Sequence, residues 1–322
     1  MPQFQPPGRA AAAHVPIPSA LAILLALAAG ARAQDFDKVE VRTEKVAGHL
    51  YMLRGAGGNM GLCTGVDGAF LIDDEFAPLT AKIQAAVASV TDKPIRFVLS
   101  THWHDDHVGG NENLGKAGAV LVAHENVRER LAVDQILDYG TGKLDTTRAL
   151  SHAGLPLVTF AHDIRFHVNG EEVHVFHVDD AHTDGDAVVH FEKANVVHTG
   201  DLFFADSYPY IDLAAGGSVD GMIAAADRIL GMVDGSTKII PGHGPLSDRA
   251  GLQAFRDMLA ANRDRVRAAI AEGRTLEQVQ AARLTAPFDA QWGGSKFMTP
   301  KLFVEILYRD LWRQVAAPGT RH

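Results

Sequence analysis

A short run of the sequence places four side chains that can hold metal ions within six positions. The run is His102-Trp103-His104-Asp105-Asp106-His107, and it directly follows a strand-like segment. Residues two apart in an extended chain point to the same side, so His102 and His104 can face one ion. If the chain then turns into a helix, Asp106 and His107 can face a neighbouring point. This spacing favours a metal site over an ordinary polar loop.

Three further segments each place a ligand-type residue just after a predicted strand. His182 lies in Ala181-His182-Thr183-Asp184-Gly185-Asp186, Asp201 ends His198-Thr199-Gly200-Asp201, and His243 lies in Pro241-Gly242-His243-Gly244. Loops that follow strands are where mixed α and β folds usually hold their chemistry. One such histidine would be weak evidence, but four such places in one chain indicate a metal centre.

The cysteine content limits what the ligands can be. Cys63 is the only cysteine in the chain. An intramolecular disulfide and a thiolate-rich zinc site are therefore both excluded, and any metal must be held by histidine and carboxylate. We expect Cys63 itself to be a buried, inert thiol within a strand.

Histidine and aspartate in this pattern suit hydrolysis. Three imidazoles leave zinc an open position, and carboxylates allow a second ion about 3.5–4 Å away. Zinc lowers the pKa of a bound water from about 15.7 to about 7, which supplies hydroxide near neutral pH to attack a carbonyl or ester carbon. Asp106 is the candidate to orient this nucleophile and pass a proton to the leaving group.

Alternating strands and helices must position these residues. Apolar periodicity predicts the following elements: strands at 50–53, 69–72, 95–99, 119–122, 164–168, 172–178, 187–191, 196–198 and 238–240, and helices at 78–90, 125–137, 219–232, 250–272, 276–283 and 301–315. Residues 138–156 are expected to form a loop. The two halves share one order, strands first and then helix and strand, which predicts two β-rich layers with helices outside.

The N-terminus has the features of an export signal. Arg9 precedes an apolar run from Ala20 to Ala29, and Ala31-Arg32-Ala33 has small residues where signal peptidase cuts. We therefore expect a signal peptide at residues 1–33, one domain at 34–322, and a periplasmic or secreted protein. The apolar run is too short to span a bilayer, although an N-terminal anchor is the alternative. Cleavage after Ala33 would leave 289 of the 322 residues and, through loss of two arginines, move the formal charge from −9 to −11.

Composition narrows the possible partners. Hydrophobic residues make up 47% of the chain, which is enough for a folded core. A negative mature chain without a basic run is a poor polyanion binder, so nucleic acid is not expected as a partner. We expect a small-molecule substrate and no stable membrane insertion after signal cleavage.

Taken together, these motifs resemble those of the metallo-β-lactamase superfamily, over roughly residues 39–244. The resemblance implies an α+β fold, the αββα sandwich, with two mixed sheets face to face and helices on both outer faces. It implies that two Zn²⁺ ions are held by seven residues: His102, His104 and His182 at one ion, Asp106, His107 and His243 at the other, and Asp201 between them. Asp73 resembles the acidic residue that orients a ligand histidine in this family.

The use of an aspartate at position 201 is similar to that in the glyoxalase II and lactonase branches of the family. It differs from the lactamase branch, which has a cysteine at this position. That branch commonly has a lysine nearby for the substrate carboxylate, but none follows Asp201 within ten residues. The resemblance implies that the loop at 55–60 covers the substrate. Tyr208 and Tyr210 are candidates to contact the substrate, with ordinary loop packing as the alternative.

We therefore predict a dinuclear zinc hydrolase that cleaves an amide, ester or lactone bond, with β-lactams among the candidate substrates. One alternative is an iron dioxygenase on the same fold, similar to persulfide dioxygenases, with a single Fe²⁺. A second alternative is a metal-binding accessory protein without turnover. A complete second ligand set favours two metals over one.

Overall fold

The computed structural model describes residues 35–138 and 144–316. Residues from Phe36 onward belong to one compact unit, which opens with a short 3₁₀ helix, η1 (Phe36–Lys38). The signal peptide expected at residues 1–33 lies outside the described residues. Among the helices of the described residues, none is both long and apolar enough to cross a membrane.

The first of two large sheets has seven strands. In spatial order they are β1 (Arg42–Ala47), β2 (Leu50–Arg54), β3 (Met60–Cys63), β4 (Ala69–Ile72), β5 (Ile95–Leu99), β6 (Val120–His124) and β9 (Val158–Phe160). Strands β1 to β4 pair antiparallel, and β4, β5, β6 and β9 pair parallel. The sheet is therefore mixed, and its parallel half carries the first ligand run at the end of β5.

The second large sheet has six strands. In spatial order they are β10 (Asp163–Val168), β11 (Glu171–His177), β12 (Ala187–Phe191), β13 (Val196–His198), β14 (Lys238–Ile240) and β15 (Ser247–Asp248). Only β13 and β14 pair parallel. The loops after these two strands therefore start side by side.

The two sheets pack face to face. Side chains alternate between the two faces of a strand. In β4, Phe70 and Ile72 join the core between the sheets, whereas Leu71 points outward. In β11, Val175 joins the same central core and Phe176 points outward. Both sheets are thus buried on two faces, which explains why β3 and β4 are buried along their whole length.

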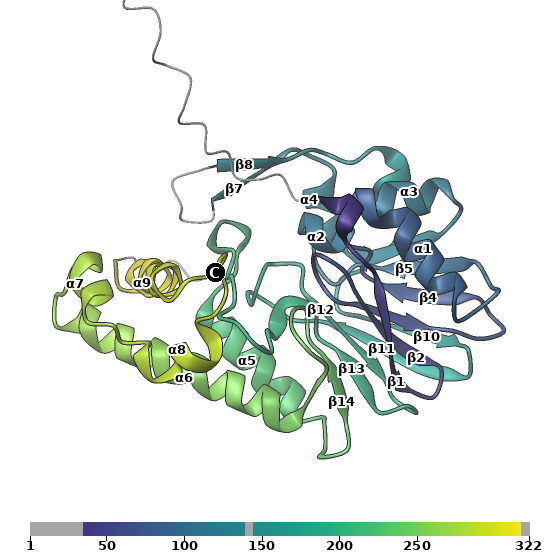
Figure 1. Cartoon of the computed structure of the whole chain (residues 1–322). Coiled ribbons are helices and arrows are strands. Elements are labelled where there is room, and N and C mark those ends of the chain that lie inside the picture. Colours follow the sequence, from purple (N-terminus) through teal and green to yellow (C-terminus); the bar gives the residue numbers. More distant parts are fainter. Residues whose placement is uncertain (1–34, 139–143, 317–322) are drawn as a thin grey trace, which may run out of the picture. The chain divides into compact units, whose positions relative to one another are not determined.

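Helices cover the outer face of the first sheet (Figure 1). A 3₁₀ turn, η2 (Ala77–Leu79), leads into α1 (Thr80–Ala88), and α3 (Asn111–Lys116) lies beside it. Ile83 and Val87 of α1 and Leu114 of α3 pack on Leu71 and Val98 of the sheet. Two more short helices, α2 (Asp105–Val108) and α4 (Glu125–Leu131), follow β5 and β6.

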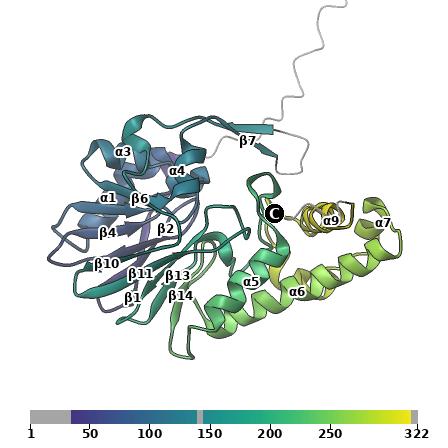
Figure 2. The same cartoon turned by 180° about the vertical axis from the view of Figure 1, so that it is seen from behind.

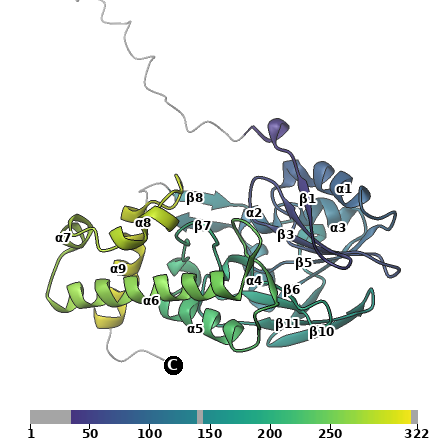
Figure 3. The same cartoon turned by 60° about the horizontal axis from the view of Figure 1, so that its bottom comes forward.

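The outer face of the second sheet is covered by α5 (Val219–Leu230) and α6 (Arg249–Ala271), which lie side by side in the front and back views (Figures 1 and 2). Ser218 caps α5 by accepting a hydrogen bond from the Gly221 amide. Three further helices continue the chain: the short α7 (Leu276–Ala281) and α8 (Ala286–Trp292), and the longer α9 (Pro300–Ala316). Figure 3 shows them gathered along one part of α6. The predicted αββα sandwich is confirmed.

One predicted helix is wrong at its end. The helix expected at 125–137 ends at Leu131, and Gln135–Asp138 instead forms β7, which pairs with β8 (Leu144–Thr147) in a two-stranded sheet. Gln135 Nε2 donates to the carbonyl of Arg130 at 3.0 Å and so occupies a helix C-terminal acceptor. The segment expected to be loop thus contains β8 and a 3₁₀ turn, η3 (His152–Gly154).

Candidate metal centre

The loops that carry the expected ligands leave the sheets at neighbouring strand ends. β5 ends at Leu99 and leads into His102, β13 ends just before Asp201, and β14 ends just before His243. His182 lies in the loop between β11 and β12. Asp201 itself sits in a 3₁₀ turn, η4 (Gly200–Leu202), which begins with Gly200 at a φ of 51°. A side chain there would meet Thr101, so this position suits glycine.

Four of the expected ligands form one buried group: His102, His104, His182 and Asp201. One donor atom from each lies within 4.8 Å of the others. His182 Nε2 is 2.9 Å from His104 Nδ1 and 3.4 Å from Asp201 Oδ2. Donor atoms bound to one tetrahedral zinc at about 2.0–2.1 Å are about 3.3 Å apart. The spacing of this group therefore suits a single cation.

The other three expected ligands form a second, more open group: Asp106, His107 and His243. His243 Nε2 lies 3.5 Å from His107 Nε2 and 3.4 Å from Asp106 Oδ2. The His107 side chain is fully buried, while the Asp106 and His243 side chains are each 27% exposed. This group therefore faces solvent on one side, where a substrate can approach.

Asp201 lies between the two groups. Its Oδ1 is 3.1 Å from His107 Nε2 and 3.3 Å from His243 Nε2. Its Oδ2 is 3.4 Å from His182 Nε2 and 3.8 Å from His102 Nε2. One carboxylate thus presents one oxygen to each group, as a residue shared by two cations would.

Hydrogen bonds on the far side of two rings orient His102 and His107. His107 Nδ1 lies 2.7 Å from Asp73 Oδ2, so it donates to the carboxylate and leaves Nε2 as a free lone pair. Thr101 donates to the same Asp73 oxygen at 2.8 Å, and its hydroxyl oxygen is 3.1 Å from His102 Nδ1. Both rings therefore present Nε2 to the ligand groups.

The other two ligands of the first group are oriented in the same way. His104 Nε2 lies 3.0 Å from Asp212 Oδ2, which leaves Nδ1 as its ligand atom. Asp212 also accepts from Ala214 and Ala215 at the start of η5 (Leu213–Ala215). His182 Nδ1 donates to the carbonyl of Tyr210 at 2.9 Å. Such partners fix which ring nitrogen can bind a metal.

Asp186 holds the loop that carries His182. Its Oδ2 accepts from the backbone amides of His182 and Thr183 at 2.6 and 2.8 Å, and its Oδ1 accepts from the Thr183 hydroxyl at 2.6 Å. Burial raises the pKa of Asp186 to about 8, against the effect of these donors. The sequence analysis assigned no role to Asp186, although His182-Thr183-Asp184-Gly185-Asp186 is part of the quoted motif.

The glycine-rich loop at 55–60 lies directly against the second group. A Cβ atom on Gly58 would come within 2.1 Å of the His107 ring, and one on Gly57 within 2.7 Å of Asp106 Cβ. Glu75 Oε2 accepts from the amides of Ala56 and Gly57, both at 3.0 Å. The expected substrate-covering loop is therefore fastened to the ligand loops, and its glycines allow the close approach.

Charge inside the cluster shifts the histidines in opposite directions. Burial lowers the pKa of His182 to about 4 despite the nearby Asp201, and it lowers the pKa of His102 well below the usual range. For His243, Asp201 and Asp106 outweigh burial and raise the pKa to about 10. Burial disfavours ionised Asp106, yet His107 and His243 outweigh it and lower this pKa to about 2. The second group thus stabilises the ionised form of Asp106 and the protonated form of His243.

Two polar atoms support the fit of divalent cations here. His102 Nε2 and Asp201 Oδ1 are buried and have no hydrogen-bond partner among the described residues. Such groups destabilise a fold unless something satisfies them, and both point into the ligand groups. Imidazole and carboxylate together suit zinc. The donor set therefore fits two divalent cations.

The two tyrosines named from the sequence are placed differently. The Tyr208 hydroxyl donates to Asp289 at 2.9 Å, and its ring stacks on Phe303 in the helical core. Tyr208 thus packs away from the ligand groups, and the substrate contact expected of it is not supported. The Tyr210 ring lies 5.8 Å from the His104 ring and 6.1 Å from the His182 ring. Tyr210 is therefore next to the first group.

Other histidines near the site belong to neither ligand group. His198, the nearest of them to Asp201 in sequence, is fully buried and bonds Asn59 and Gly200 rather than joining either group. His124 stacks on His177 with ring centroids 3.8 Å apart. Sequence reasoning missed Asp212, Asp186 and Glu75, and no spacing signal marks Asp212, which lies 108 positions from His104.

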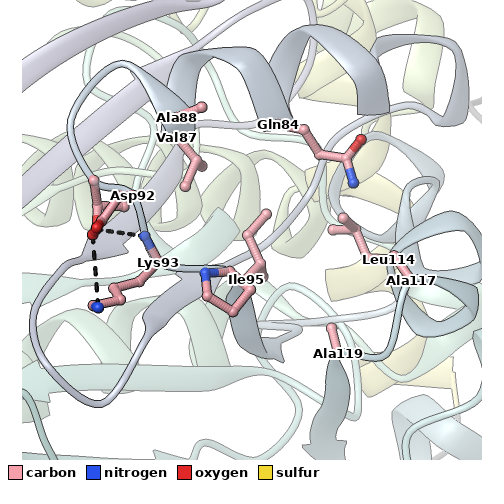
Figure 4. A pocket seen from close by; sticks show the side chains of 11 residues that line it. Gln84, Val87, Ala88, Asp92, Lys93, Ile95, Leu114, Ala117 and Ala119 are labelled. Atoms are coloured by element: carbon pink, nitrogen blue, oxygen red, sulfur yellow. Dashed lines mark hydrogen bonds and ion pairs between the residues drawn. The ribbon is translucent and has the colours of Figure 1, made fainter.

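A pocket of about 400 Å³ lies at the start of β5, whereas the candidate ligands follow the end of this strand. Figure 4 shows the side chains that line the pocket. The pocket is lined by Val87, Ala88 and Leu114, with Asp92 and Lys93 paired at its edge. Neither metal-ligand group shares a residue with it. The pocket is therefore separate from the candidate metal centre.

The fold and the site together define a class: a sandwich of two mixed sheets with a histidine and aspartate metal centre at the strand ends. The family model described as the metallo-beta-lactamase superfamily matches residues 54–247, which is more than half of the chain. The chain belongs to this superfamily.

Two curated relatives match parts of the chain. Hydroxyacylglutathione hydrolase from Erythrobacter litoralis is 29% identical over 112 residues, which cover 34% of this chain and 35% of the relative. Metallo-beta-lactamase IND-1 from Chryseobacterium indologenes is 27% identical over 150 residues, which cover 47% of this chain and 56% of the relative. The matches thus span about a third and about half of the relatives' lengths.

Solved structures share the fold. A metallo-beta-lactamase from Pontibacter korlensis is 21% identical with a TM-score of 0.56, over 69% of this chain and 99% of its own. The stereoselective inverting sec-alkylsulfatase Pisa1 from Pseudomonas sp. is 19% identical with a TM-score of 0.65, over 84% of this chain and 50% of its own. At these identities the likeness concerns the fold.

Proposed function

We propose that this chain is a hydrolase that uses two divalent metal ions, expected to be zinc, to cleave an amide, ester or lactone bond in a small molecule. One observation carries the proposal. Asp201 directs Oδ1 to His107 and His243 and Oδ2 to His182 and His102. A carboxylate with this placement suits a pair of cations better than one.

Two zinc ions held by these seven residues would act as Lewis acids on the substrate and lower the pKa of water from about 15.7 to about 7. The protein residues would do the rest. His107 and His102 are held rigid through Asp73 and Thr101, and His104 through Asp212. This support keeps the donor atoms aligned without rearrangement during the reaction.

Asp106 is the proposed proton carrier. Its side chain is 27% exposed, and its Oδ2 lies 3.4 Å from His243 Nε2. With a pKa of about 2, Asp106 is a carboxylate at neutral pH. It would accept a hydrogen bond from the attacking water, take up its proton, and pass the proton to the leaving group.

The names of the two curated relatives guide the choice of substrate. One is named for hydrolysis of a hydroxyacylglutathione and the other for β-lactams. Both names point to attack at an acyl carbon. We therefore propose acyl substrates first, with β-lactams among those to be tested.

The test is a hydrolysis screen of the purified, zinc-loaded protein with lactones, aryl esters, thioesters, phosphodiesters and β-lactams. We expect acyl compounds to be cleaved and chelation to abolish turnover. His102→Ala should remove activity, whereas His167→Ala, a change at an exposed histidine, should leave it intact. Full turnover after exhaustive chelation, or turnover of phosphodiesters alone, would contradict the proposal.

Metal analysis separates the proposal from its alternatives. Two zinc ions per chain would support the hydrolase, and one iron per chain would support the dioxygenase. The complete second group of Asp106, His107 and His243 supports two metals. A metal-loaded protein that turns over none of the screened compounds, with or without Asp106→Ala, would instead support an accessory role.

We also propose that the chain is exported and cleaved after Ala33. The support is the sequence pattern of Arg9, the apolar run 20–29 and Ala31-Arg32-Ala33. Mass spectrometry of the N-terminus, after expression with the full leader and cell fractionation, tests this. A mature chain that begins at Gln34 in the exported fraction is expected, and an intact Met1 in the cytoplasm would contradict it.

A further inference from the structure

Aromatic rings line the ligand groups on one side. The Phe204 ring stacks on the His243 ring at 5.0 Å with an interplanar angle of 16°, and it lies 6.2 Å from the His182 ring. Tyr210 lies 5.8 Å from His104. Phe204 and Tyr210 are themselves buried, at 7% and 6% exposure, so they form the floor of this side rather than its rim.

A third ring continues this surface outward. Phe297 lies 6.3 Å from Tyr210, ring centroid to ring centroid, in the segment that joins α8 to α9. Its side chain is 55% exposed, which is unusual for a phenylalanine in a well-packed protein. Phe297 lies outside the part of the chain that matches the superfamily model. The C-terminal helical segment thus supplies an exposed ring beside the metal centre.

The backbone around Phe297 is held in place. Ser295 Oγ accepts from the amides of Phe297 and Met298 at 3.1 and 3.0 Å, and Met298 is 1% exposed in the helical core. An anchored neighbour and a local turn hold the backbone at Phe297 in place. The exposed ring is therefore part of a built surface and does not result from a loose loop.

In the described part of the chain, every ion pair of Asp106 and Asp201 is with a histidine and none is with lysine or arginine. Lys296 is exposed beside Phe297 and is the nearest cation in sequence. Its contribution can be separated from that of the ring by substitution.

We propose that Phe297, Tyr210 and Phe204 form an apolar subsite that binds an uncharged hydrophobic group next to the bond that is cleaved. The substrates would then be neutral esters or lactones with an aliphatic or aromatic acyl chain, rather than compounds with a carboxylate at that place. This inference rests on the proposed hydrolase function, and it makes Phe297 a residue that determines specificity.

The kinetic test compares 4-nitrophenyl acetate, butyrate and hexanoate with the mono-4-nitrophenyl ester of adipic acid, which adds a carboxylate at the chain end. Burial of one methylene raises kcat/KM by up to about fourfold. We expect the hexanoate to exceed the acetate by at least about tenfold, and the adipate ester to fall well below the hexanoate.

Two variants of the same loop sharpen the comparison. Phe297→Ala should reduce the gain from acetate to hexanoate to less than about threefold. Lys296→Ala should keep the wild-type profile. A wild-type profile that is flat, a Phe297→Ala profile that is unchanged, or a loss caused by Lys296→Ala alone would each overturn the subsite.

A binding experiment tests the same subsite without turnover. Hexanophenone is a neutral ketone with no bond to hydrolyse, and its binding to the zinc-loaded protein can be followed by calorimetry. We expect Phe297→Ala to weaken this binding about fivefold or more and Lys296→Ala to leave it unchanged. Equal binding by wild type and Phe297→Ala would overturn the subsite. Failure of the zinc-loaded wild type to cleave any ester would instead contradict the proposed function.

Discussion

Asp73 Oδ2 lies 2.7 Å from His107 Nδ1, and both side chains are fully buried. The same oxygen accepts the Thr101 hydroxyl, which lies 3.1 Å from His102 Nδ1. One carboxylate behind the cluster therefore supports a ligand in each group. Asp73 adopts a φ of 58°, a left-handed conformation that asparagine also tolerates. Asp73→Asn thus changes the hydrogen bonds with little change to the backbone.

We predict that Asp73→Asn weakens zinc binding about 10- to 100-fold, because an amide nitrogen cannot accept a hydrogen bond from the imidazole N–H. Competition with a chromophoric chelator would measure the Kd of each zinc. Asp92→Asn, at a side chain that is 88% exposed, is the control and should leave both Kd values unchanged. Unaltered zinc affinity in Asp73→Asn would show that this hydrogen bond does not orient His107.

The corresponding change on the first group is Asp212→Asn. Asp212 Oδ2 lies 3.0 Å from His104 Nε2, while its Oδ1 accepts from Ala214 and Ala215. We predict a loss of affinity of about 10- to 100-fold at the first zinc, with the second zinc affected less. Stepwise titration with Co²⁺, whose absorption reports on each site, would separate the two. Equal weakening of both sites would indicate a general loosening of the fold.

The candidate ligands were predictable from the sequence, whereas most of the residues that hold them in place were not. The seven candidate ligands carry their own chemistry and lie just after strands, so residue type and strand order were enough to name them as candidates. Asp212 and Glu75 act through partners far away in sequence, at 108 and 18–19 positions, and nothing local marks them. Only the folded arrangement brings such residues to the rings and loops they hold.

The fold followed the same rule. β5, β12, β13 and β14 are mainly apolar, and their predicted bounds agree with the structure. The helix expected at 125–137 was wrong because Val133, Ile136 and Leu137 continue an apolar spacing past the true end at Leu131. Gln135–Asp138 forms β7 because it pairs with β8, which lies later in the chain. Apolar periodicity within the segment alone does not distinguish this strand from a continued helix.

The contact of the glycine loop with the cluster gives a third prediction. A Cβ on Gly58 would overlap the His107 ring at 2.1 Å, so Gly58→Ala must displace either the loop or the ligand. We expect a destabilisation of about 1–3 kcal/mol and a marked loss of zinc affinity. Thermal unfolding and chelator competition would measure the two effects.

Gly235 provides the matched control. No atom lies within 4 Å of a Cβ built on it, and its φ lies outside the positive range. Gly235→Ala should therefore change the free energy of unfolding by no more than about 1 kcal/mol, and can increase it by restricting the unfolded chain. If Gly58→Ala behaved like Gly235→Ala, the loop would be free to move away from His107.

Metal removal should lower stability. A ligand that binds only the folded state stabilises it by about 2.7 kcal/mol at 100 times its Kd. His102 Nε2 and Asp201 Oδ1 are buried without a hydrogen-bond partner among the described residues, and a bound metal ion would satisfy both atoms. We therefore expect the Tm to rise with zinc concentration and to fall on addition of a chelator. Asp201→Ala should abolish most of this dependence, and a zinc-independent Tm in the wild type would contradict the assignment of the ligands.

The lone cysteine gives a pH prediction that is independent of the metal centre. Burial raises the pKa of Cys63 from its ordinary value of 9.0 to about 12, although Asn169 Nδ2 contacts its sulfur at 3.7 Å. The unfolded chain therefore releases this proton at a lower pH than the folded chain does. The contribution of Cys63 to stability is complete below pH 9 and is lost between about pH 9 and 12.

In the native protein at pH 8.5, a maleimide should react at the rate of unfolding. Addition of urea should accelerate the labelling, and Cys63→Ala should flatten the fall in stability above pH 9. Rapid labelling without denaturant would show that the strand exposes its thiol.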